Sequence, residues 1–300
     1  MKVLILGGSG FVGRNLVECL CEKFDVMVAA RNPATGQVYF DINDRASYPA
    51  LANLKPDVII NAAAFGVRKT EQDLETMYNV NYIMAAKLYE HMVANGFQGF
   101  WFQLGTAFEY DLSKPGGITE STPCLPATHY GISKLMFSRY LMTYGKPGSF
   151  TILRPFGMYG KFEDSSKFFP MLLTAQFRKE VVRLSSGMQK RDYFFVDGLG
   201  QFMGTLIRGN QLSTLPRVMN LGSGEALSLR EYASILSHTL SDYDPSLWQW
   251  DTVPLRENES SLFYNASDLA VTYGFACPDQ RHGFLATVNH YKSKIHGVAR

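Results

Sequence analysis

Two side chains with spacing suited to acid–base chemistry stand at the start of a predicted helix. Tyr130 and Lys134 lie four residues apart in "HYGISKL", and the next stretch, "MFSRYLM", has apolar residues at helical spacing. Residues four apart share one helix face, so the phenol and the ammonium can reach the same small object. A nearby ammonium favours the phenolate, so we expect the pKa of Tyr130 to fall from its ordinary value of about 10. The pair could then exchange protons near neutral pH. An ordinary surface helix shows the same pattern, so the rest of the chain has to decide.

A glycine-rich loop near the N-terminus indicates a nucleotide site. Gly7, Gly8, Gly10 and Gly13 stand between the apolar run "KVLIL" and a helix predicted from about Phe11 to Cys21. In a strand–loop–helix unit such glycines permit a tight turn, close approach of a pyrophosphate and packing of helix on strand. The phosphate then sits at the helix N-terminus, where unpaired N–H groups face it. We therefore expect a bound dinucleotide.

The end of the second predicted strand bears on which dinucleotide binds. A site for NAD usually has an acidic residue about 20 residues after the glycine loop, on the ribose 2′-hydroxyl. Here "VAARNP" provides Ala29, Ala30 and Arg31 instead. A guanidinium suits a 2′-phosphate in charge and geometry. We therefore favour NADP(H), while NAD(H) stays possible if Arg31 is only a solvated loop residue.

Short apolar runs alternate with helical patterns through the first half of the chain. The runs are "KVLIL", "VMVAA", "VYFDI", "DVIINAAA", "GFWFQL" and "SFTILRP", and the longest helix is predicted from about Asp73 to Ala94. This alternation predicts an α/β fold with a doubly wound parallel sheet, the Rossmann arrangement. We expect residues 1–155 to form the dinucleotide-binding domain, with pieces near 192–222 rejoining it. Residues 156–300 are expected to form a smaller mixed α/β substrate lobe, in which Ser228 and Glu231 open a helix with a capping box.

Composition excludes several classes of function. Of the 300 residues 46% are hydrophobic and 19% charged, and the net charge of +2 gives no support for binding to nucleic acid or an anionic membrane. The N-terminal apolar run is too short for a signal peptide, and we find no stretch long enough to span a membrane. The four cysteines and six histidines are scattered. We expect a cytoplasmic protein without a metal site.

With the glycine loop and the Tyr130/Lys134 pair in place, the sequence resembles the extended short-chain dehydrogenase/reductase superfamily. Within it, the nucleotide-sugar epimerase, dehydratase and reductase group is the more similar. The resemblance runs along nearly the whole chain, through "FDI", "NAAAFGVR", "YNVNYIMAAKLYE", "LGTAFEYD" and "ESTPCLPATHYGISK". It implies catalytic roles for Thr106, Tyr130 and Lys134. The cofactor-binding residues that it implies, together with Arg31, are Gly7, Gly10, Phe11, Val12, Gly13, Asp41, Ile42, Ala62, Ala63, Ala64, Asn79, Tyr130, Lys134 and Pro155.

The second half of the chain carries the substrate part of the resemblance, in "LRPFGMYG", "GMQKRDYFFVDG" and "PLRENES". The group's residues that hold a sugar-nucleotide diphosphate map to Arg191 and Arg256. Gly157 stands where many members have a substrate-binding asparagine, so we expect open space near the sugar there. The substrate-binding residues implied are Thr106, Phe108, Gly157, Arg191 and Arg256.

The resemblance implies hydride transfer at a sugar carbon, most often C4. The group's 4,6-dehydratases carry an Asp-Glu pair after the catalytic threonine, and its C3/C5 epimerases a cysteine two residues beyond it. This chain has Ala107 and Phe108 there, which disfavours both reactions. A 4-ketoreductase or a 4-epimerase remains.

Arg31 favours the reductase, because a reductase consumes NADPH. We expect reduction of a nucleoside-diphosphate 4-keto-6-deoxy or 3,6-dideoxy sugar, in the biosynthesis of deoxysugars for surface polysaccharide such as lipopolysaccharide. An NAD-dependent 4-epimerase is the alternative. A non-catalytic redox sensor is disfavoured, since Tyr130, Lys134 and Thr106 are all present. Family members commonly form homodimers through a helix bundle, here the helices that start near Asp73 and Tyr130.

Overall fold

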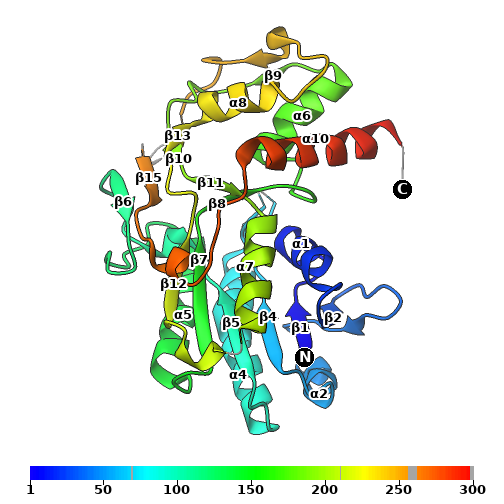
Figure 1. Ribbon diagram of the computed structural model, residues 1–300, viewed down its shortest axis with the longest axis vertical. Coiled ribbons are helices and arrows are strands. Elements are labelled where there is room, and N and C mark those ends of the chain that lie inside the picture. Colours follow the sequence, from blue (N-terminus) through cyan, green and yellow to red (C-terminus); the bar gives the residue numbers. More distant parts are fainter. Residues whose placement is uncertain (69, 210, 256–261, 298–300) are drawn as a thin grey trace.

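A seven-stranded parallel sheet organises the first half of the chain in the computed structural model, which describes residues 1–68, 70–209, 211–255 and 262–297 (Figure 1). The strand order is β12-β7-β5-β4-β1-β2-β3, and all pairs are parallel. The doubly wound Rossmann prediction is confirmed. The strands are β1 (Lys2–Leu6), β2 (Asp25–Ala30), β3 (Val38–Tyr39), β4 (Val58–Asn61), β5 (Phe100–Leu104), β7 (Phe150–Pro155) and β12 (Val218–Leu221).

Helices cover both faces of this sheet, which is why its central strands are apolar without interruption. Alternate side chains of β1 point toward opposite faces of the sheet. Val3 and Ile5 pack in one core with α1 (Phe11–Leu20) and α7 (Asp197–Arg208). Leu4 and Leu6 pack in the other with α2 (Tyr48–Asn53), α4 (Met84–Ala94) and α5 (His129–Tyr144).

The helix predicted from Asp73 to Ala94 is present, with a change of pitch. It consists of α3 (Leu74–Tyr78), a π-helical turn η2 (Asn79–Ile83) and α4 in direct succession. The Asp73 carboxylate caps its start by accepting the Thr76 N–H at 2.7 Å. Wide turns of this kind often occur at functional sites.

The second half of the chain builds a smaller lobe above the sheet in Figure 1 and also returns to the sheet itself. Tyr159, Phe169, Tyr232 and Phe284 form the aromatic centre of this lobe. The predicted capping box of Ser228 and Glu231 is confirmed at the start of α8. Because α7 and β12 pack with the sheet, the chain crosses between the two parts more than once, and the division at residue 155 stays a prediction. The elements of the lobe and the short 3-10 turns are β6 (Gly116–Ile118), β8 (Gly157–Tyr159), α6 (Phe168–Arg178), β9 (Val182–Arg183), β10 (Lys190–Arg191), β11 (Tyr193–Phe195), β13 (Leu227–Ser228), α8 (Leu229–Ser237), β14 (Trp248–Gln249), β15 (Leu262–Asn265), α9 (Leu269–Thr272), α10 (Gln280–His296), η1 (Arg45–Ser47), η4 (Leu212–Thr214) and η5 (Pro245–Leu247).

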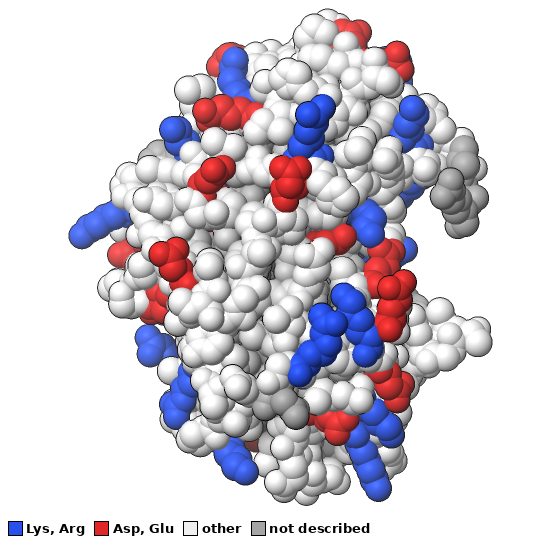
Figure 2. Space-filling view, in the orientation of Figure 1, with Lys and Arg blue, Asp and Glu red and all other residues white. Residues whose placement is uncertain are grey.

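Charges of both signs are interspersed on the face of the molecule shown in Figure 2. Among the described residues, no helix is both long and apolar enough to span a bilayer. The four cysteines are free, and the described part of the chain holds no cluster of three potential metal ligands.

Candidate active site

The residues predicted to bind cofactor follow the carboxyl ends of neighbouring strands, the edge at which open parallel sheets bind ligands. The glycine loop follows β1, and the register Leu6↔Ala29 between β1 and β2 brings Arg31 beside it. The other strands place their residues at this same edge: Ala62, Ala63 and Ala64 follow β4, Thr106 follows β5, and Pro155 ends β7.

The glycine loop fits a pyrophosphate. Gly7 has φ +76°, and a Cβ there would lie 2.8 Å from the Ala63 nitrogen. A Cβ on Gly13 would lie 2.2 Å from the Gly7 oxygen, so only glycine lets α1 approach the loop this closely. Gly10 forms the N-cap of α1, where no side chain caps the helix and the first turn has no acidic residue. The N–H groups of this turn, which contains Phe11 and Val12, can therefore donate hydrogen bonds to phosphate oxygens.

The residues predicted around the adenosine part follow the strands β2 and β3, which come next to β1 in the sheet. Arg31 is exposed and has no ion-pair partner within the described ranges. Asp41 accepts the Asn43 N–H at 2.9 Å, while Ile42 is buried and its carbonyl accepts the Tyr48 hydroxyl. An exposed guanidinium beside a phosphate-binding loop suits a second phosphate.

Thr106 is fixed by the 3-10 turn η3 (Ala107–Glu109) that follows it. Its hydroxyl accepts the Phe108 N–H at 3.3 Å, and its own N–H donates to Glu109 Oε1 at 3.0 Å. A Cβ on Gly131 would lie 2.2 Å from the Phe108 carbonyl oxygen. This close contact sets η3 against the first turn of α5, beside Tyr130, so the three candidate catalytic residues come from two touching elements.

In the acid–base pair of α5, Lys134 is buried and Tyr130 is partly buried. Lys134 is 3% exposed, and within the described residues neither its ammonium nor the Tyr130 hydroxyl has a hydrogen-bond partner. Burial lowers the pKa of Lys134 to about 8, against an opposing effect of Glu109. Two unpartnered polar groups at the cofactor edge fit the ribose and the reacting oxygen of a dinucleotide–substrate complex.

The expected fall in the pKa of Tyr130 is wrong for this structure. Burial raises the pKa of its phenol above the ordinary value of 10.0, and the carboxylates of Glu109 and Glu71 raise it further. The spacing in the sequence revealed the nearby cation, Lys134. It revealed neither the burial of the phenol nor the two carboxylates that raise its pKa. Tyr130 is therefore a protonated phenol at neutral pH, suited to donating a proton.

Three residues predicted to bind substrate meet at one cavity. Phe108, Gly157 and Arg191 line a cavity of about 90 Å³, and the Arg191 guanidinium lies 4.9 Å from the Phe263 ring centre. The remaining lining residues include Ala107, Pro155, Phe156, Asp192, Tyr193 and Phe263. Arg256 lies outside the described residues.

The expectation of open space at Gly157 is wrong. A Cβ there would lie 2.4 Å from Tyr193 Cδ1 and 2.7 Å from the Asp192 carbonyl oxygen. Pairing of β8 with β11 sets Tyr193 directly beside Gly157. The tyrosine ring therefore occupies the volume into which an asparagine at this position would extend.

Sequence reasoning missed Glu109 and Arg154, which form a buried ion pair of 2.8 Å between Arg154 Nη2 and Glu109 Oε2. Two signals could have found them. Thr106-x-x-Glu109 is a capping-box spacing. An arginine inside the apolar strand "FTILRP" must have a buried counter-ion. Neither signal reveals that the two side chains meet.

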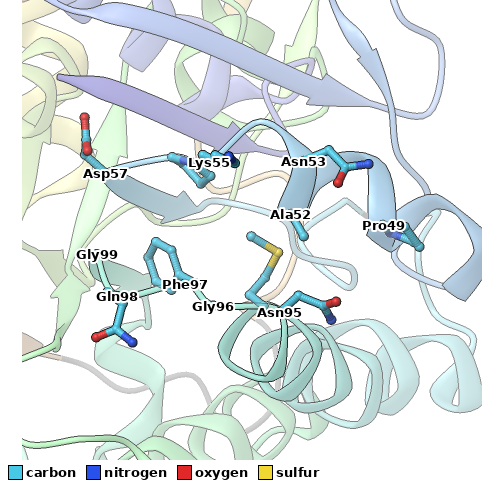
Figure 3. A pocket seen from close by; sticks show the side chains of 12 residues that line it. Pro49, Ala52, Asn53, Lys55, Asp57, Asn95, Gly96, Phe97, Gln98 and Gly99 are labelled. Carbon is cyan, nitrogen blue, oxygen red and sulfur yellow. The ribbon is translucent and has the colours of Figure 1, made fainter.

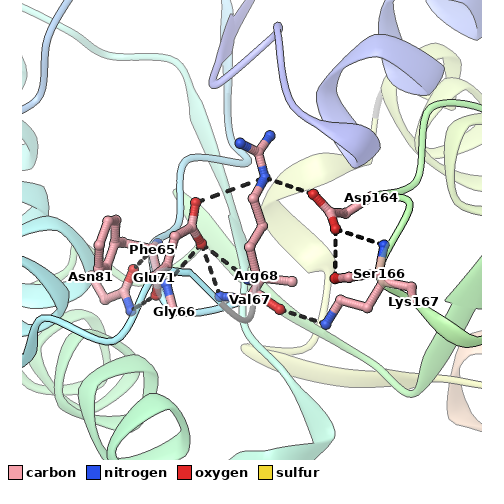
Figure 4. A network of polar contacts seen from close by, with 9 residues as sticks. All are labelled: Phe65, Gly66, Val67, Arg68, Glu71, Asn81, Asp164, Ser166 and Lys167. Atoms are coloured by element: carbon pink, nitrogen blue, oxygen red, sulfur yellow. Dashed lines mark hydrogen bonds and ion pairs between the residues drawn. The ribbon is translucent and has the colours of Figure 1, made fainter.

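Polar contacts join a loop of the sheet to a loop of the smaller lobe (Figure 4). Glu71 Oε2 accepts the N–H groups of Gly66, Val67 and Arg68, each at 3.1 Å. The Arg68 guanidinium lies 3.6 Å from Asp164 Oδ2, and Lys167, also in the loop after β8, donates to the Val67 carbonyl. The loop after β4 is thus tied to the loop after β8.

A larger hollow of about 530 Å³ lies at the opposite edge of the sheet, before the starts of β4 and β5 (Figure 3). Its lining comes from α2, the segment around Lys55 to Asp57 and the chain from Met92 to Gly99. None of the candidate catalytic, cofactor-binding or substrate-binding residues lines it.

Three curated relatives are named for a reaction at position 4 of a nucleotide sugar. It is 28% identical to a GDP-6-deoxy-D-talose 4-dehydrogenase of Aggregatibacter actinomycetemcomitans, over 66% of this chain and 67% of that protein. A dTDP-6-deoxy-L-talose 4-dehydrogenase (NAD(P)(+)) of Kitasatospora kifunensis is also 28% identical, over 78% of each chain. A putative UDP-glucose 4-epimerase of Methanocaldococcus jannaschii is 24% identical, over 97% of this chain and 98% of that one.

Solved structures share the fold. MoeE5 in complex with UDP-glucose and NAD superimposes with a TM-score of 0.84, over 98% of this chain and all of that one (100%), at 22% identity. The sequence profile of the NAD dependent epimerase/dehydratase family matches residues 3–222. With its parallel sheet, glycine loop and Thr106/Tyr130/Lys134 site, the chain belongs to this family, the extended branch of the short-chain dehydrogenases/reductases.

Proposed function

We propose that the protein is an NADPH-dependent reductase of the C4 keto group of a nucleoside-diphosphate 4-keto-6-deoxy or 3,6-dideoxy sugar. The observation that carries this proposal is a complete set of acid–base residues beside an apolar side chain, Phe108, at a position where a dehydratase or a C3/C5 epimerase would need a reactive one. Thr106, Tyr130 and Lys134 are held by touching elements, and Phe108 faces the same cavity as Arg191. No acid stands at Ala107 or Phe108 for dehydration.

The residues divide the work of a ketone reduction. Bound NADPH would supply the hydride to the keto carbon. Tyr130, kept protonated by burial, would donate its phenolic proton to the developing alkoxide. Thr106 would hydrogen-bond the same oxygen and fix its position. Lys134 would hold the ribose hydroxyls, and the net reaction consumes one proton and one NADPH for each alcohol formed.

The walls of the cavity favour a deoxysugar. Phe108, Phe156, Tyr193 and Phe263 surround it with aromatic carbon, and Arg191 is the cation at its edge. An apolar wall accepts a methyl group at C6 at lower cost than a hydroxymethyl group, whose hydroxyl would lose its hydrogen bonds to water. Arg191 suits the diphosphate, and the two 6-deoxytalose 4-dehydrogenases among the relatives act on sugars of this class, by their names.

The preference for NADPH rests on Arg31. Its guanidinium is exposed beside the glycine loop, at the position where NAD sites carry an acid. NAD(H) remains the alternative cofactor, as in the MoeE5 complex.

An NAD-dependent nucleotide-sugar 4-epimerase is the second candidate, favoured by the epimerase relative that matches along 97% of this chain. A stoichiometric assay separates the two. A reductase oxidises one NADPH for each nucleoside-diphosphate 4-keto-6-deoxyhexose, followed at 340 nm with the product identified by NMR. An epimerase interconverts two C4 epimers without added cofactor. Retained NAD together with epimer interconversion would refute the reductase. NADPH binding without any turnover on a panel of nucleotides would favour the non-catalytic redox sensor.

The proposal includes a homodimer in a cytoplasmic setting. Apolar side chains are exposed along η2, α4 and α5, as a helix-bundle interface requires. These residues are Ile83, Val93, Met136, Met142 and Tyr144. The four free cysteines suit a reducing compartment. Light scattering of the purified protein would show twice the mass of the chain, and a monomer at micromolar concentration would contradict the interface.

A further inference from the structure

The carboxylate of Glu109 is fully buried, and its two oxygens accept hydrogen bonds from different residues. Oε1 accepts the backbone N–H of Thr106 at 3.0 Å, and Oε2 accepts Arg154 Nε at 2.9 Å. Gly105 leaves room for this arrangement, because a Cβ there would lie 2.4 Å from Oε1. The carboxylate therefore connects the residue before η3 to strand β7.

Arg154 extends the connection across the sheet edge. Its guanidinium stacks on the Tyr110 ring at 4.6 Å, and the Tyr110 hydroxyl donates to Asn220 Oδ1 at 2.8 Å. Asn220 belongs to β12, and its N–H donates to Glu120 at 2.7 Å. A buried network from β5 to β12 thus holds Thr106 in place. A side chain that is to fix the position of a reacting oxygen needs such support.

The same carboxylate acts on the acid–base pair through its charge. Glu109 raises the pKa of both Tyr130 and Lys134, in the first case together with Glu71 from the loop after β4. The charged and titratable groups around this region are Glu71, Glu109, Glu120, Cys124, His129 and Arg154.

We propose that Glu109 is a positioning residue: one of its oxygens orients Thr106, and the η3 turn that carries it packs against the first turn of α5, so that its negative charge acts on the Tyr130/Lys134 pair. The proposal rests on the proposed function, because it assigns Thr106 and Lys134 to the reducing site. Glu109 is not placed to touch substrate, because its side chain is fully buried and both of its oxygens are engaged.

Glu109→Gln tests the charge, because a glutamine oxygen can still accept the Thr106 N–H. Without the carboxylate, and with Arg154 left unpaired, both Tyr130 and Lys134 lose their protons more easily. We expect the alkaline limb of the kcat/KM profile to move to lower pH by about one unit. Tyr110→Phe is the matched control, since it removes the hydrogen bond to Asn220 but no charge. A limb that stays in place in Glu109→Gln, or moves equally in Tyr110→Phe, would overturn the proposal.

A second readout needs no turnover. In protein labelled at lysine Cε, the ¹³C resonance that disappears in Lys134→Met reports the titration of Lys134. We expect its midpoint to fall in Glu109→Gln and to stay at the wild-type value in Tyr110→Phe. If wild type reduces no nucleotide sugar but the midpoint falls, the proposed function fails and the role of Glu109 stands. If wild type is active and the midpoint is unchanged, the role of Glu109 fails alone.

A doubly neutral variant covers the case in which Glu109→Gln does not fold. Glu109→Gln/Arg154→Met removes both charges of the buried pair and leaves no unpaired ion. The midpoint of Lys134 should still lie below the wild-type value, because the carboxylate that favours its ammonium is gone. A midpoint equal to that of wild type would refute the role of Glu109.

Discussion

Replacing Lys134 by methionine should stabilise the protein while abolishing its activity. Lys134 is 3% exposed and its ammonium has no hydrogen-bond partner among the described residues, so burial removes much of the hydration of its charge and the carboxylate of Glu109 offsets only part of that loss. Its pKa falls from the ordinary 10.5 to about 8. At about 1.4 kcal/mol per pKa unit, the buried charge costs about 3 kcal/mol at pH 7. Methionine is unbranched and fills a similar volume without that cost.

The sign of the pH dependence follows from the same two pKa values. Between about pH 8 and 10.5 the unfolded chain holds a proton on Lys134 that the folded chain has released. Wild-type stability from this group therefore rises with pH across that window. The advantage of Lys134→Met should shrink from about 3 kcal/mol at pH 7 to about 1 kcal/mol at pH 9.5.

Urea denaturation of wild type and Lys134→Met at pH 7 and pH 9.5 measures both effects. Lys87→Met, which removes an exposed lysine from α4, is the matched control and should show no such advantage. Turnover should be lost in Lys134→Met alone, because the cation that would hold the cofactor ribose is absent. A Lys134→Met protein that is less stable than wild type at pH 7, or whose advantage does not shrink, would refute the reasoning.

Three further predictions concern the cofactor, the proton donor and the packing around Gly157. Arg31→Ala should weaken NADPH binding roughly tenfold or more, because a charge-assisted hydrogen bond is lost, and should leave NADH binding unchanged. A fluorescence titration measures both affinities, and equal losses for the two cofactors would contradict a 2′-phosphate contact. Tyr130→Phe should lower kcat at least a hundredfold with NADPH binding intact, while Tyr140→Phe on the same helix, whose hydroxyl donates to Glu90, should keep its activity; an active Tyr130→Phe would exclude it as the proton donor. Gly157→Asn should cost about 1–3 kcal/mol of stability in urea denaturation, because its Cβ would meet Tyr193 at 2.4 Å; an unchanged midpoint would show that Tyr193 moves freely.

The sequence determined the framework because its signals are local. A strand, a loop with Gly7, Gly10 and Gly13, and a helix are contiguous in the chain, so spacing alone predicts a phosphate site. Alternating apolar runs predicted the parallel sheet, and a capping box predicted the start of α8 at Ser228. Tyr130 and Lys134 share a helix turn, so their proximity also needed no tertiary information.

The tertiary structure decided what lies between segments that are far apart in the chain. Glu109 and Arg154 are 45 residues apart, and only the adjacency of β5 and β7 pairs them under Thr106. Pairing of β8 with β11 brings Tyr193 into the space that Gly157 had suggested was open. The direction of the Tyr130 pKa depends on burial and on two acids from other segments, which the four-residue spacing to Lys134 does not contain. Desolvation and long-range contacts are properties of the packed chain. The sequence therefore offers candidate residues for the site, whereas the protonation of Tyr130 and Lys134 depends on the tertiary structure.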